Sequence, residues 1–189
     1  MDRYNYIYKM ITHQKIFIHA NEINQNMELT ISKKIKELEG RCLSVGYILK
    51  NSINMLERKT GIINSDNGKV NFNISFQMIV INPKINNLIP CRIIEVNKLG
   101  FLAQGGYNGV SNDSYPLQIV LVKQNHNREN TRNYDEFLEL KKDMFIVVKV
   151  LSTRCNFKDT YIKVSGQFED RITRDEFNEH IEDIKQLIN

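Results

Sequence analysis

Hydrophobic and polar positions alternate over most of the chain, a period that predicts β-strands. Two such segments, residues 4–10 and 14–19, open the sequence. Apolar residues then recur every three or four positions, which predicts an amphipathic helix that begins after Asn26 and ends at Gly40. The apolar side of this helix consists of Met27, Ile31, Ile35 and Leu38.

Alternation returns between Cys42 and Ile81 and is interrupted by Asn67-Gly68, a pair that favours a tight hairpin turn. Several strands together with one helix indicate a small α+β unit. We expect this N-terminal domain to span residues 1–83.

Farther along the chain, alternating segments predict five more short strands, with a long polar excursion at residues 124–132 after the third strand. Five short strands with one excursion are typical of a small barrel of the OB type, whereas a β-sandwich needs about seven strands. We expect this barrel domain over residues 84–170.

A capping-box pattern, Thr173 followed by Glu176, marks the start of a C-terminal amphipathic helix. The helix is expected over residues 174–188, within an acidic tail of residues 171–189. Its apolar side must be buried on this chain or on a partner, and consists of Phe177, Ile181, Ile184 and Leu187. The predicted fold class is α+β: a small N-terminal α+β domain, a five-stranded OB-type β-barrel and this C-terminal helix.

Charge is unevenly distributed along the 189 residues. Residues 1–166 carry a formal charge of +8 and residues 167–189 carry −4, for a net charge of +4. A basic body favours a polyanionic partner. No run of apolar residues is long enough to cross a membrane, so we expect no membrane contact.

Recognisable catalytic patterns are missing from the sequence, which contains no G-x-S-x-G, P-loop, H-E-x-x-H or G-x-G-x-x-G motif. We therefore expect neither enzyme activity nor a cofactor. The three cysteines are far apart and none lies in a C-x-x-C, which favours free thiols in a reducing compartment and argues against a metal site.

Three segments in order resemble a known family. They are LEGRCLSVGYILK at 38–50, EVNKLGF at 95–101 and IVVKVLSTRCNFKDTYIKVSGQFED at 146–170. Their order and spacing are similar to those of the stalk subunits of multisubunit DNA-dependent RNA polymerases, a likeness that covers roughly residues 5–170. The helix predicted from residue 174 extends beyond the family's usual ending.

The resemblance implies a non-catalytic polymerase subunit. Its N-terminal tip domain would dock on the largest subunits of the core, a small helical second stalk subunit would accompany it, and its OB domain would contact nascent single-stranded RNA. The location implied is the nucleus for a eukaryotic protein, or the virion or host cytoplasm for a large DNA virus, whose AT-rich genome would fit the abundance of Asn and Ile.

Single-stranded RNA is bound by cations that contact phosphates and by exposed rings on which bases stack. On an OB barrel these groups lie on the loops after strands 1 and 4 and on the adjoining face. The candidate RNA-binding residues are Lys98, Phe101, Lys149, Arg154, Phe157, Lys158, Tyr161 and Lys163. Packing of the two Phe rings in the core and plain solvation of the cations remain alternatives.

The candidate polymerase-docking residues mix apolar side chains with flexible glycines. They are Arg58, Lys59, Gly61, Ile62, Ile63 and Gly68. Without the resemblance, this segment would be interpreted as a plain hairpin end. Two other functions remain open: a free-standing OB-fold RNA-binding factor in translation or RNA decay, and a purely architectural polymerase subunit.

Overall fold

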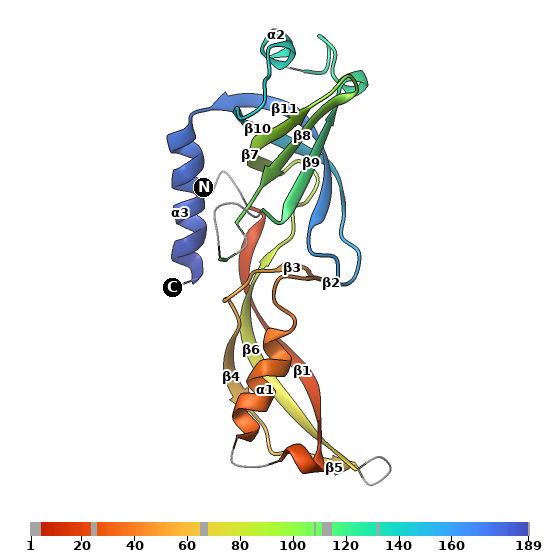
Figure 1. The fold of residues 1–189 in the computed structure, drawn as a ribbon, viewed down its shortest axis with the longest axis vertical. Helices are drawn as coiled ribbons and strands as arrows, with labels where there is room; N and C mark the ends of the chain where they lie inside the picture. The colour runs from red at the N-terminus through yellow and green to blue at the C-terminus, as the bar shows by residue number, and fades with distance from the viewer. Residues whose placement is uncertain are drawn as a thin grey trace.

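The computed structural model describes residues 5–23, 26–64, 68–107, 109–110, 115–131 and 133–188. The molecule is elongated, with an open sheet in one half and a closed barrel in the other (Figure 1). Residue 4 of the first predicted strand, Asn67 of the predicted turn and Arg132 of the polar excursion lie outside the described residues.

The open sheet is built around one long central strand. Its strands are β1 (Ile7–His19), β2 (Cys42–Leu43), β3 (Gly46–Ile48), β4 (Asn54–Arg58), β5 (Ile62–Asn64) and β6 (Lys69–Ile81). β6 pairs antiparallel with β1 on one side and with β3, β4 and β5 on the other. The prediction of two N-terminal strands is wrong, because β6 is long enough to pair with residues 7 to 19 without a break.

One face of β6 is covered by α1 (Met27–Lys36), which follows the short 3₁₀ helix Ala20–Glu22. The buried side chains alternate along β6 and pack with Ile31 and Ile35 of α1. The predicted helix is confirmed, although it ends at Lys36 and the residues up to Gly40 form turns. Near the barrel, Ile79 of β6 joins a second core shared with the barrel strands.

The barrel contains β7 (Leu88–Val96), β8 (Gly100–Gly105), β9 (Leu117–Val122), β10 (Phe145–Arg154) and β11 (Ile162–Ile172). It closes in the order β10-β11-β9-β8-β7, with β9 and β11 parallel and the other pairs antiparallel. This arrangement, with the fifth strand between the third and the fourth, is the OB topology. The predicted α+β class with an OB-type barrel is confirmed.

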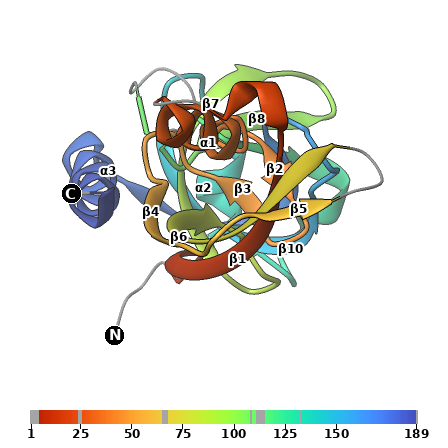
Figure 2. The ribbon, with the colours of Figure 1, turned by 90° about the horizontal axis from the view of Figure 1, so that it is seen from below.

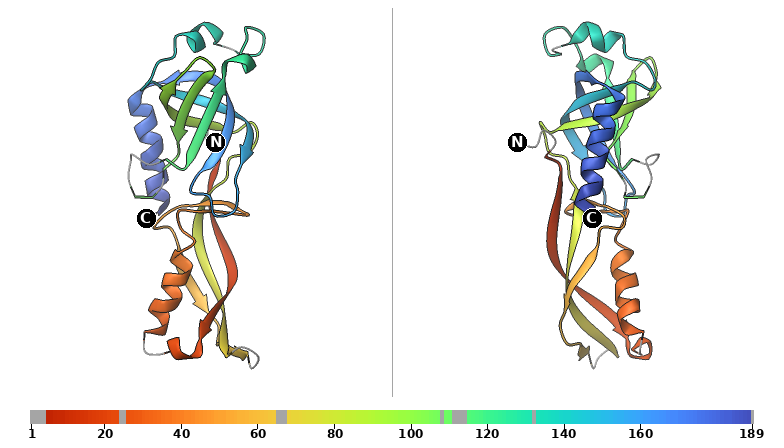
Figure 3. Two further views of the ribbon diagram at one scale, coloured as in Figure 1. Left: turned by 45° about the vertical axis from the view of Figure 1, so that its right-hand side comes forward. Right: turned by 90° about the vertical axis from the view of Figure 1, so that its left-hand side faces the viewer.

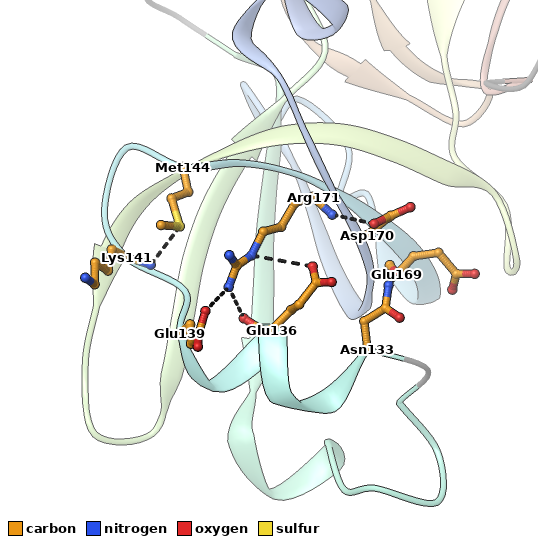
Figure 4. Close-up of polar contacts among 8 residues, drawn as sticks. All are labelled: Asn133, Glu136, Glu139, Lys141, Met144, Glu169, Asp170 and Arg171. Atoms are coloured by element: carbon orange, nitrogen blue, oxygen red, sulfur yellow. Dashed lines mark hydrogen bonds and ion pairs between the residues drawn. The ribbon is translucent and has the colours of Figure 1, made fainter.

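The excursion between β9 and β10 closes one end of the barrel. It contains the 3₁₀ helix Lys123–Asn125 and the helix α2 (Tyr134–Leu138). Arg171 of β11 ties α2 to the barrel: its guanidinium donates to the carbonyl of Glu136 at 2.7 Å and pairs with the Glu139 carboxylate at 3.1 Å (Figure 4). This segment, residues 123–131 and 133–144, is called the barrel cover below.

The C-terminal helix α3 (Arg174–Ile188) begins with the predicted capping box. The N–H of Glu176 donates to Oγ1 of Thr173 at 3.2 Å, and the Thr173 N–H donates to the Glu176 carboxylate at 2.8 Å. α3 runs alongside the molecule, as Figures 2 and 3 show. Most of its predicted apolar side is buried on this chain, through Phe177, Ile181 and Ile184, whereas Leu187 is 38% exposed.

Candidate nucleic-acid interface

The loop between β10 and β11 is held against the open sheet by backbone hydrogen bonds. The N–H of Cys42 donates to the carbonyl of Asp159 at 2.7 Å, and the N–H of Lys158 donates to the carbonyl of Cys42 at 2.8 Å. Lys158 has a φ of 68°, a left-handed conformation that turns the chain at this point. The loop is therefore fixed relative to both halves of the molecule.

Three predicted RNA-binding residues lie here with their side chains exposed: Arg154 at the end of β10, and Phe157 and Lys158 in the loop, together called the loop cluster below. The Phe157 side chain is 69% exposed, and Lys158 Nζ lies 5.5 Å from the centroid of its ring. Nε of Arg154 donates to the side-chain oxygen of Asn156 at 3.2 Å. An exposed ring with cations nearby is the arrangement that stacks a base and contacts its phosphates.

The outer side of β11 extends this basic surface along the barrel wall. Lys163 is the cross-strand partner of Arg154, so the two side chains lie on the same side of the sheet. Lys163 Nζ also lies 5.7 Å from the Tyr161 ring centroid. Lys149 is half-buried and pairs with Gln167 farther along the strands, away from the loop cluster.

Phe101 is unavailable for base stacking, and its assignment as an RNA-binding residue is wrong. Its side chain is only 3% exposed and packs edge-on against Phe137, with 5.2 Å between ring centroids. The alternation of β8 points Phe101 and Ala103 into the barrel. An aromatic residue close to a turn can still be the first residue of its strand whose side chain points into the barrel.

Lys98 is exposed but lies at the other end of the barrel from the loop cluster. It sits in the turn between β7 and β8, where the side-chain oxygen of Asn97 accepts the N–H groups of Leu99 and Gly100, each at 2.9 Å. Because β7 runs antiparallel to β10, this turn lies where β10 begins and the loop cluster where it ends. One small ligand cannot contact both.

The predicted docking residues lie at the end of the open sheet that is farthest from the barrel. Ile62 and Ile63 on β5 are both strongly exposed. Arg58 points back onto the sheet, with its guanidinium 5.4 Å from the Phe72 ring and 3.5 Å from the carboxylate of Glu28. The two Ile side chains are therefore available to a partner, whereas Arg58 already has contacts within the chain.

The remaining docking candidates shape the backbone of this end. Lys59 is exposed, and its N–H donates to the carbonyl of Asn73 at 2.9 Å. A Cβ added at Gly61 would lie 2.6 Å from the ring of Phe72, so only glycine fits there without a shift. Gly68 directly precedes β6 and has a φ of 65°.

A buried histidine in the barrel cover was not singled out by its sequence. The His126 ring stacks on Phe137, with 4.0 Å between centroids and planes 7° apart. Its Nε2 accepts the N–H of Phe168 at 2.9 Å, so Nδ1 carries the proton and donates to the carbonyl of Val122 at 2.8 Å. Burial lowers the pKa of His126. The ring is therefore a neutral structural group.

Metal ligands are not grouped in the described part of the chain: no three His, Cys, Asp or Glu side chains there could hold a metal ion. None of the described helices is long and apolar enough to span a membrane.

The fold and the loop cluster define an α+β protein with an OB-type barrel that presents cations beside an exposed ring. No protein-family model matches the chain. The chain is similar to DNA-directed RNA polymerase II subunit RPB7 of Glycine max, with 21% identity over 157 residues that cover 82% of this chain and 88% of that protein. It is also similar to DNA-directed RNA polymerase II subunit 7 of Arabidopsis thaliana, 23% identical over 159 residues, covering 78% and 84%. The resemblance to polymerase stalk subunits is thereby confirmed.

Proposed function

We propose that this chain is a non-catalytic stalk subunit of a DNA-dependent RNA polymerase. Residues 1–83 dock on the largest subunits of the core, and the barrel of residues 84–170 contacts nascent single-stranded RNA. The observation that carries the proposal is the similarity to two polymerase II subunits over about four-fifths of the chain. The exposed Ile pair at one end and the loop cluster on the barrel support the two contacts.

RNA contact at the loop cluster rests on its charge and its rigidity. Arg154 and Lys158 can contact phosphates while a base stacks on Phe157, and the backbone bonds to Cys42 hold these groups in place before RNA arrives. A stacking contact contributes about 1–3 kcal/mol and is tolerant of sequence. Such a surface suits a subunit that must hold any transcript loosely.

Replacing Arg154 with Ala together with Lys158→Asn is expected to make RNA binding less dependent on salt. Asn is chosen because it tolerates the left-handed backbone at this position. Each phosphate contact contributes about −0.7 to the log–log salt slope for single strands, so the slope should flatten by up to about 1.4. Fluorescence anisotropy with labelled oligouridine at several salt concentrations measures this.

The control removes two exposed cations from the other end of the barrel, Lys141→Ala with Lys142→Ala. It should leave most of the slope in place. Equal flattening in both double variants would show that only net charge matters. Unchanged RNA binding in both double variants would contradict RNA contact by the barrel. A purely architectural polymerase subunit would then be the better explanation.

Ile63→Asp is expected to release the chain from the polymerase without unfolding it. Ile63 is 75% exposed, so a carboxylate there costs little in the free chain but would be desolvated in an apolar contact. Leu99→Asp, equally exposed at 75% on the far end of the barrel, is the matched control. Tagged chains are pulled down from the native source, and the two largest polymerase subunits are measured by mass spectrometry.

Recovery with Leu99→Asp and at least about a tenfold loss with Ile63→Asp is the expected result. Recovery of translation or RNA-decay factors without polymerase would overturn the stalk assignment. A free-standing OB-fold RNA-binding factor would then explain the barrel better.

A further inference from the structure

Strand β1 has one long edge that no other described strand covers. Among the strands that the structure describes, β6 is its only partner, and β1 stands last in the strand order of its sheet. Figures 1 and 3 show β1 along the margin of the sheet half. An open strand edge presents backbone donors and acceptors to any extended chain that approaches it.

The backbone hydrogen bonds show which groups face outward. The N–H of Asn82 donates to the carbonyl of Tyr6 at 2.9 Å, so Tyr6 faces β6. In an antiparallel ladder successive residues alternate, and the odd-numbered residues of β1 therefore direct their N–H and C=O groups outward. The bond from Lys34 Nζ to the Phe17 carbonyl at 3.1 Å agrees with this direction.

Part of this edge already has partners and part does not. Lys34 occupies the Phe17 carbonyl, and the N–H of His19 donates to the carboxylate of Glu22 at 3.2 Å. Within the described ranges, no protein group bonds the outward backbone groups of the intervening odd positions, which are Lys9, Ile11, His13 and Lys15. These positions are solvent-exposed.

Side chains along the edge follow a symmetrical pattern on one side of the sheet. Ile11, 58% exposed, and Phe17, 50% exposed, flank the basic residues His13 and Lys15. The pattern apolar–basic–basic–apolar is the same in both directions. A strand running either way along β1 would therefore meet the same sequence of side chains.

A depression of about 260 Å³ lies beside this basic centre. Asn73 of β6 is its middle: Lys15 is the cross-strand partner of Asn73 on one side, and the N–H of Lys59 bonds the Asn73 carbonyl on the other. Lys15 and Lys59 thus lie on the two sides of Asn73. The full lining is His13, Gln14, Lys15, Lys59, Asn73, Ile74 and Ser75. These groups suit a carboxylate.

We propose that β1 accepts an extended acidic segment of a partner protein as an additional strand. Backbone groups of the segment pair with the outward edge, its acidic side chains enter the depression, and apolar side chains on either side contact Ile11 and Phe17. The ladder of outward N–H and C=O groups selects a polypeptide over a nucleic acid, which has no matching backbone. This surface is separate from the exposed Ile pair and the loop cluster. The proposal can therefore be tested independently of the proposed function.

The probe is a synthetic peptide, Thr-Val-Thr-Glu-Thr-Glu-Thr-Val-Thr, with a control peptide that has Lys at both Glu positions. Hydrogen exchange of backbone amides is measured on the full chain. Saturating acidic peptide should slow exchange of the outward amides of Ile11, His13 and Lys15 by at least about tenfold, because strand addition hydrogen-bonds them. The Lys peptide should not. Absence of this protection would overturn the proposal.

Two variants of one residue separate the backbone from the side chain. Lys15→Pro removes the outward N–H without breaking the ladder to β6, and Lys15→Ala removes only the ammonium group. The Pro variant should bind the acidic peptide about fivefold more weakly than the Ala variant. Equal weakening would show that charge alone attracts the peptide and would overturn strand addition.

Two further outcomes would also overturn it. Displacement of the bound peptide by oligouridine would assign the basic depression to RNA. Concentration-dependent self-association that protects the same amides without any peptide would make a second copy of this chain the occupant.

Discussion

Lowering the pH from about 6.5 to about 4 is expected to destabilise the folded chain by about 3 kcal/mol through His180 alone. His180 lies on the buried side of α3, with Nε2 2.8 Å from the hydroxyl of Tyr6. Desolvation lowers its pKa to about 4, and the nearby carboxylate of Asp183 opposes that shift only in part. The ring is therefore neutral in the folded chain at neutral pH.

The sign of this change in stability follows from the uptake of a proton by His180. Below about pH 6.5 the unfolded chain binds a proton at His180, whereas the folded chain does not bind it until about pH 4. The stability is therefore fully present above pH 6.5 and is lost across this interval. Because His180 joins α3 to Tyr6, the helix should detach first.

Urea denaturation at several pH values across the interval measures this loss. His180→Gln is the control, since a neutral amide can bond the Tyr6 hydroxyl but does not titrate. Burial also lowers the pKa of His126, so both proteins should weaken in acid, and the difference between them isolates His180. Identical slopes in the two proteins would contradict the assignment.

Phe137→Ala is expected to cost about 3–5 kcal/mol of folding free energy. The ring is fully buried between the barrel and its cover, where it stacks on His126 and contacts Phe101 and Phe168. Removing it leaves a cavity and deprives His126 of the ring that covers it. The cover should exchange its amides much faster, and urea denaturation gives the total loss.

Phe157→Ala is the matched control, because it deletes the same ring from a side chain that is 69% exposed. Its effect on stability should stay within about 0.5 kcal/mol. A comparable loss in both variants would mean that Phe157 is packed in the folded chain. That result would also remove it from the RNA interface.

For the candidate site, the sequence pattern predicted which residues of a strand share a side. In β11, alternation puts Ile162 and Val164 on one side of the strand and Lys163 on the other, and the structure buries the first two and exposes Lys163. Phe101 shows the limit of this reasoning, because a strand's period defines two faces and does not say which one is buried. The choice came from Phe137, a residue of the barrel cover that packs on Phe101 from outside its strand.

By itself, the sequence determined those features whose causes lie within a few residues. The capping box of Thr173 and Glu176, the amphipathic α1 and the alternation of the barrel strands all depend on local hydrogen bonds or on one period of side chains. The order of the five short strands and the polar excursion were sufficient to indicate the OB-type barrel, which the tertiary structure confirms.

Only the tertiary structure decided what depends on distant partners. β1 is one strand because β6 is long enough to pair with all of it, and its outer edge is open because no other described strand lies there. Cys42 bonds the loop that carries Phe157 and Lys158, and Tyr6 bonds His180. In both cases the partners are far apart in the sequence, so the spacing of side chains within one segment does not predict the contact. Such long-range contacts form only when the whole chain folds, so their geometry is set by the tertiary structure.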